Sequence, residues 1–276
     1  MRLVCSVLLA CFSAPVCASE HVADTPVPGG AGLTAHDLLV KVMPDLERHD
    51  TGLAGSQPVT LRLLLEPEFD AFPHSLVSVD WVQFQPLRSG GEDHLLLLAS
   101  LGPGEFAIAD VVLLALFDED FELLDAANVG LDRVINFGEP PLLQIGRNSE
   151  AVILTNQHWN SNQAYSDIAL VGVAEERLSM LASFFMLSDQ ACGFANTQSV
   201  DFSTLAEGPG PWPLVAILRE ERTLDPTCIP DQELAPANSQ SLELTLYWDE
   251  KGGHYVHTPE GALALEQWRR ATEARF

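Results

Sequence analysis

Residues 242–257 have the sequence LELTLYWDEKGGHYVH, which indicates a pair of antiparallel β-strands. Every second residue from Leu242 to Trp248 is apolar, and this alternation is typical of a strand with one buried face. The segment Asp249–Gly253 supplies a turn, and His254–His257 is the expected returning strand. The hairpin is therefore the expected building unit of this chain.

Similar units follow one another through the middle of the sequence. An apolar run at Ala107–Phe117 is followed by an acidic turn, and further apolar stretches lie at Ala151–Thr155, Ile168–Val173 and Leu178–Met186. No repeat of fixed period joins them. The pattern predicts a mainly β fold of antiparallel hairpins, arranged as a sandwich or as a propeller-like stack.

A helix is expected at each end of this β-rich region. Thr34 is a suitable N-cap for a short helix that begins at Ala35. Thr258 is a suitable N-cap for a terminal helix, with Pro259 at the first helical position, where a missing N–H costs little. The expected apolar side of the terminal helix consists of Leu263, Leu265 and Trp268.

The first 18 residues have the three parts of an export signal. Arg2 gives a positive start, an apolar stretch follows, and Val16-Cys17-Ala18 places small residues at a cleavage site. We therefore expect a periplasmic or secreted protein. A cleavage box for lipid attachment at Cys11 is the alternative, although the apolar stretch before it is short.

The rest of the chain is expected to form one folded unit. Residues 19–32 contain prolines and adjacent glycines, which predict a flexible leader. Residues 33–276 are predicted to form a single β-rich domain. The segment 208–213, GPGPWP, is either a long surface loop or a domain boundary.

Two cysteines remain after removal of the signal. Cys192 and Cys228 are an even pair in a chain expected to reach an oxidising compartment, which predicts a disulfide between them. No arrangement of His or Asn in the sequence supports the alternative of a catalytic Cys192.

The composition excludes some classes of partner. The chain has 39 Asp and Glu residues against 14 Lys and Arg, for a net charge of −25. Such a charge repels nucleic acid and anionic lipid surfaces. Hydrophobic residues make up 47% of the chain, enough for a packed core, but no later apolar run is long enough for a membrane span.

The segment Asn156–Tyr165 is the strongest candidate for ligand binding. It combines aromatic faces with amide groups, which suit a sugar or another small polar molecule, because a ring stacks while amides fix orientation. The alternative is a hairpin loop whose polar side chains bond their own backbone. The candidate ligand-binding residues are His158, Trp159, Asn160, Asn162 and Tyr165.

A calcium site is the second candidate. Asp118, Asp120 and Asp125 belong to the densest group of carboxylates, and Ca²⁺ prefers several oxygen ligands. The twelve-residue calcium loop pattern is missing, so a solvated acidic turn is the alternative. His254 and His257 are expected on opposite faces of a strand, which argues against a shared metal. No other cofactor is indicated.

The sequence contains no nucleophile elbow, phosphate loop, dinucleotide fingerprint or zinc-protease motif. We therefore expect a non-catalytic binding protein or envelope accessory protein, whose partner is a small molecule, a glycan or an envelope protein. Two alternatives stay open. One is a hydrolase with dispersed Asp and Glu residues, with or without calcium. The other is a structural or interaction protein of the envelope.

Overall fold

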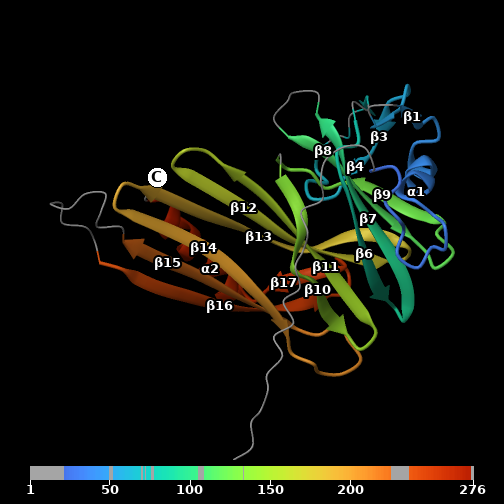
Figure 1. Cartoon of the computed structure of the whole chain (residues 1–276). Helices are drawn as coiled ribbons and strands as arrows, with labels where there is room; N and C mark the ends of the chain where they lie inside the picture. The colour runs from blue at the N-terminus through green and yellow to red at the C-terminus, as the bar shows by residue number, and fades with distance from the viewer. Residues whose placement is uncertain are drawn as a thin grey trace, which may run out of the picture.

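The computed structural model describes residues 22–49, 52–69, 71, 73–75, 78–104, 109–132, 134–224 and 236–274 (Figure 1). The predicted signal, residues 1–18, and one predicted disulfide partner, Cys228, lie outside these ranges. Within them the protein is mainly β, with a short helix near the N-terminus and a longer one near the C-terminus. The predicted fold class is confirmed.

The larger sheet is an antiparallel succession of hairpins in which each strand pairs with the one before it. Short turns suffice for such connections, in agreement with the predicted hairpin unit. Its eight strands are β10 (Val134–Gly146), β11 (Ser149–Trp159), β12 (Gln163–Ala174), β13 (Arg177–Ala191), β14 (Phe194–Thr204), β15 (Leu214–Leu224), β16 (Asn238–Asp249) and β17 (His254–His257).

The smaller sheet has five strands, and lies to the right of the larger one in Figure 1. Its order is β4 (Arg62–Leu63), β9 (Leu123–Asn128), β8 (Asp110–Phe117), β7 (Glu92–Pro103) and β6 (Val82–Ser89), with only the first pair parallel. Two short pairs accompany it. They are β1 (Glu47–His49) with β2 (Gly52–Ala54), and β3 (Val59–Thr60) with β5 (Pro73–His74).

Three groups of buried apolar side chains connect these layers. The first lies between α1 (Ala35–Val42) and the smaller sheet. The second joins the two sheets, because Leu96 and Leu114 of the smaller sheet belong to one cluster with Val152 and Val171 of the larger sheet. The third lies between the larger sheet and α2 (Pro259–Glu273). The two sheets therefore pack face to face, as the sandwich alternative predicts.

The hairpin predicted at residues 242–257 is present. β16 and β17 pair from Leu246 with His257 to Asp249 with His254. Leu244 and Leu246 are buried, whereas Tyr247 is 50% exposed, so the alternating pattern does orient the apolar side chains inward.

Both helices begin at the predicted caps. Thr34 and Asp37 form a capping box on α1. The Thr258 hydroxyl accepts a hydrogen bond from the Gly261 N–H at 3.0 Å on α2. The predicted apolar side of α2 is only partly correct, because Leu265 is buried but Leu263 is 56% exposed.

Two expectations about connecting segments change. Residues 22–32, predicted as a flexible leader, are folded: the Val27 N–H donates to the Leu33 carbonyl at 3.0 Å, and the Val27 side chain is buried in the core.

Residues 208–213 connect β14 with β15, which pair directly from Phe194 with Leu224 to Thr204 with Leu214. This segment is therefore the loop of a hairpin within one sheet.

Candidate ligand-binding site

The predicted polar loop at Asn156–Tyr165 is mostly strand. β11 continues to Trp159 and β12 begins at Gln163, so only three residues form the turn. Polar composition suggested a loop, but pairing of His158 with Tyr165 and of Trp159 with Ala164 extends both strands. Successive side chains of a strand point to opposite faces. The structure therefore divides the five predicted residues between two sides of the sheet.

Asn160 stabilises the turn itself. Its side-chain oxygen accepts hydrogen bonds from the backbone N–H groups of Asn162, at 3.0 Å, and Gln163, at 2.9 Å. This is the local bonding that the alternative interpretation of the segment expected. Asn160 therefore shapes the site, and its side-chain oxygen is already occupied.

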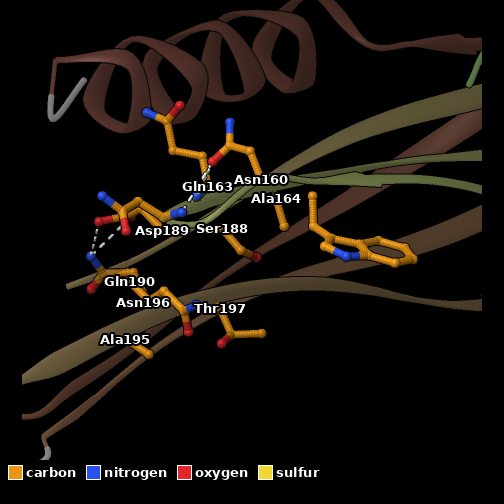
Figure 2. Close-up of a pocket in the computed structure, with 11 residues that line it drawn as sticks. Asn160, Gln163, Ala164, Ser188, Asp189, Gln190, Ala195, Asn196 and Thr197 are labelled. Atoms are coloured by element: carbon orange, nitrogen blue, oxygen red, sulfur yellow. Dashed lines mark hydrogen bonds between the residues drawn. The ribbon is translucent and has the colours of Figure 1, made fainter. Parts of the chain in front are cut away.

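The first hollow at this hairpin, here called the Trp159 groove, has a volume of about 260 Å³ (Figure 2). Trp159 and Asn162 line it from the hairpin, and β13 and β14 contribute the opposite wall. The Trp159 side chain is 61% exposed. The residues lining it from β13 and β14 include Ser188, Asp189, Gln190, Asn196 and Thr197.

The polar groups of the Trp159 groove differ in their availability. The Asn196 side-chain amide donates to both oxygens of the Asp189 carboxylate, at 3.0 Å each, which holds the only acidic side chain of this lining in place. In the part of the chain that the structure describes, no hydrogen bond engages the side chains of Asn162, Gln163 or Thr197. These groups are free to bind a ligand with hydroxyl or amide groups.

A second hollow of about 510 Å³, here called the His158 pocket, shares the tip of the hairpin. His158 and Tyr165 line it together with Phe185 and Leu187, and Glu273 of α2 lies at its border. The rings of His158 and Tyr165 stack with centroids 5.3 Å apart, and Tyr165 contacts Phe185 at the same distance. This pocket is therefore more apolar than the Trp159 groove.

Asp132 holds both rings of the His158 pocket. It is 5% exposed, and its carboxylate accepts hydrogen bonds from His158 Nδ1, at 3.0 Å, and from the Tyr165 hydroxyl. Burial and the bond to Asp132 raise the pKa of Tyr165 to about 12, so the hydroxyl keeps its proton at neutral pH. Because Nδ1 donates to Asp132, Nε2 of a neutral His158 is a hydrogen-bond acceptor.

The His158 pocket contains a histidine that a carboxylate orients. A carboxylate that orients a histidine also occurs in enzymes in which the histidine activates a nucleophile. Among the described residues that line this pocket, none is Ser, Thr or Cys.

Asp167 lies two residues from Tyr165 on β12, and one of its carboxylate oxygens is buried without a hydrogen-bond partner in the described structure. Burial, reinforced by the negative charge of Glu66 and opposed by Arg269, raises the pKa of Asp167 to about 6. The unfolded chain gives up this proton near pH 4. The folded state therefore binds the proton more tightly, and stability is lost as the pH rises from about 4 to about 6.

Asp167→Asn is expected to remove this pH dependence. The stability of the variant relative to the wild type should increase by about 2 kcal/mol between pH 4 and pH 7, after allowance for partial exposure of the group. Urea unfolding of both proteins at a series of pH values measures the difference. A difference that stays constant with pH would show that Asp167 does not titrate in this range.

The structure does not assemble the predicted calcium ligands. Asp118 accepts hydrogen bonds from the backbone N–H groups of Asp120, at 3.0 Å, and Glu122, at 2.7 Å, so it closes the β8–β9 turn. Asp125 points elsewhere and forms an ion pair with Arg62. Over the described ranges, no group of three or more His, Cys, Asp or Glu side chains is arranged to hold a metal ion.

Several residues of the site were not predicted. Asp132 is 26 residues from His158 and 33 from Tyr165, and its sequence neighbours, Leu131 and Arg133, give no signal of its importance. Ser188 and Thr197 join the site because β13 and β14 lie beside the hairpin. Runs of polar residues in both strands are visible in the sequence, but they do not indicate which strand lies next to them.

Among the described residues, no helix is long and apolar enough to cross a membrane. Comparison of the chain with models of protein families, with curated proteins and with solved structures finds no match. The residues of the Trp159 groove and the His158 pocket are therefore the basis on which a function can be assigned.

Proposed function

We propose that this protein is a non-catalytic binding protein that takes a neutral polar ligand, of the saccharide type, in the Trp159 groove. The observation that carries the proposal is the Trp159 ring, 61% exposed beside amide and hydroxyl side chains that have no partner in the described structure. An indole face stacks on the C–H surface of a sugar, and amides bond its hydroxyl groups.

Charge supports a neutral ligand over an anionic one. The protein has a net charge of −25, and Asp189 adds a negative side chain to the groove. An anionic ligand would be repelled on approach and again on binding. A neutral saccharide avoids both costs and can also donate hydroxyl hydrogens to the Asp189 carboxylate.

The proposal includes export of the protein. The residues that support it are the charged start, apolar stretch and Val16-Cys17-Ala18 site of the signal, together with the pair Cys192 and Cys228. Cys192 lies in the turn between β13 and β14, the two strands that line one wall of the Trp159 groove. The intact mass of the exported protein should correspond to a chain that begins at Ser19 and carries a disulfide.

Trp159→Ala is expected to weaken binding of a neutral oligosaccharide about fivefold to 150-fold, because loss of one stacked ring costs roughly 1–3 kcal/mol. Calorimetric titration of the mature protein with gluco-oligosaccharides and N-acetylglucosamine oligomers measures the change. Trp159→Phe should retain part of the affinity, since a flat ring remains.

Tyr247→Ala is the matched control, because Tyr247 is a 50% exposed aromatic residue outside the groove lining. Its affinity should equal that of the wild type. If the wild type bound no saccharide of the panel, or if Trp159→Ala bound as well as the wild type, the proposal would be wrong. Hydrolysis of a bound oligosaccharide would overturn its non-catalytic part.

A further inference from the structure

A third hollow lies at the rim where the two sheets meet, and is here called the amide cleft. Its volume is about 630 Å³. It lies between β6 and β10, which are the edge strands of the smaller and the larger sheet. The polar residues that line it are Gln83, Gln85, Asn136, Glu139, Thr155 and Gln157.

The chemistry of the amide cleft matches that of the Trp159 groove. The Gln83 amide donates to the Asn136 side-chain oxygen at 3.1 Å, which ties the two sheets together across the cleft. Gln157 is exposed, and in the described structure neither its amide nor the Thr155 hydroxyl makes a hydrogen bond. Four of the six polar lining residues carry neutral amides, so the cleft suits a neutral ligand rich in hydroxyl groups.

The two hollows lie along one face of the same strand. Thr155, Gln157 and Trp159 alternate on β11, and the pairing of β11 with β12 is regular from Val152 to Trp159. Side chains two residues apart on a regular strand share a face. At about 3.4 Å per residue, Thr155 and Trp159 are about 14 Å apart along the strand.

Ser166 extends this polar surface across to β12. It pairs with Gln157 in the same register that pairs Trp159 with Ala164, so its hydroxyl lies on the same face. Polar side chains thus run from the amide cleft, over Gln157 and Ser166, to the exposed Trp159 ring.

We infer that the ligand is a linear neutral oligosaccharide of several units, with one unit stacked on Trp159 and later units bound by Gln157 and the amide cleft. This inference rests on the proposed function, because it extends the same binding surface. A single sugar would use only the groove, whereas an extended chain would bond both hollows at once. Linked contacts raise affinity without a change in either contact.

A length series tests the inference. The mature protein is titrated with β-1,4-linked and α-1,4-linked glucose oligomers of two to six units, and with the matching N-acetylglucosamine oligomers. For the oligomer that binds, the affinity should rise about tenfold from two units to six. Gln157→Ala should lower the affinity for the hexasaccharide about fivefold to tenfold and leave the affinity for the disaccharide unchanged.

Gln267→Ala provides the control, because it removes an exposed amide of α2 that is absent from the lining of both hollows. Affinity that does not depend on length, or an equal effect of Gln157→Ala on short and long ligands, would overturn the extended site and leave the Trp159 proposal standing. Absence of binding to every oligomer would overturn both.

Discussion

Asp132→Ala is expected to lower the free energy of unfolding by about 3 kcal/mol at neutral pH. The 5% exposed carboxylate of Asp132 accepts hydrogen bonds from His158 and Tyr165. Hydrogen bonds to a charged acceptor contribute about 1.5–3 kcal/mol each, and relief of the buried charge offsets part of their loss. Urea unfolding of the variant and the wild type measures the change.

Tyr165→Phe is the companion variant. It removes the hydrogen bond from the Tyr165 hydroxyl and retains the stacked ring, so we expect a smaller loss of stability than for Asp132→Ala. The double variant should then lose less than the sum of the two single effects, because both remove the same bond. A change below 0.5 kcal/mol for Asp132→Ala, on the order of a surface substitution, would show that the carboxylate does not stabilise the fold.

Asp125→Ala is expected to cost about 3 kcal/mol for a different reason. The Asp125 carboxylate on β9 pairs with Arg62 and accepts the Leu178 N–H of β13 at 2.8 Å, so it links the two sheets. The Asp125 side chain is 12% exposed and that of Arg62 is 33% exposed. Removal of one partner leaves a partly buried guanidinium without its counter-charge, which is strongly destabilising.

A surface pair serves as the control for Asp125. Asp201 pairs with Arg219, but their side chains are 65% and 41% exposed. Solvent-exposed pairs contribute little, so Asp201→Ala should change stability by less than about 1 kcal/mol in the same urea experiment. Replacing Arg62 by Met together with Asp125→Leu should be less harmful than Asp125→Ala, because no charge is then left unpaired. Equal effects of Asp125→Ala and Asp201→Ala would contradict this role of Asp125.

Local chemistry was sufficient to predict much of the fold. The alternation from Leu242 to Trp248 predicted a half-buried strand, and Thr258-Pro259 predicted the start of α2. Both signals depend on residues within a few positions of one another, and the same backbone geometry applies wherever the element lies in the fold. The hairpin connections followed for the same reason.

Local chemistry was also the source of the main error. The amide-rich composition of Asn156–Tyr165 is typical of a loop, and Asn160 does close a turn. Pairing with the neighbouring strand outweighs that composition and keeps His158 and Trp159 in extended backbone. Once the segment is a strand, the adjacent side chains of His158 and Trp159 must occupy opposite faces, which divides one predicted site into two hollows.

The amino-acid sequence by itself determined the hairpins, the helix caps and the strongly acidic character of this protein, because each depends on near neighbours or on composition alone. Only the tertiary structure placed Asp132 against His158, Asp125 against Arg62 and Thr197 beside Trp159. These contacts join residues more than twenty positions apart. They exist because sheet order and register bring particular strands together, and the packing of the whole chain selects that order.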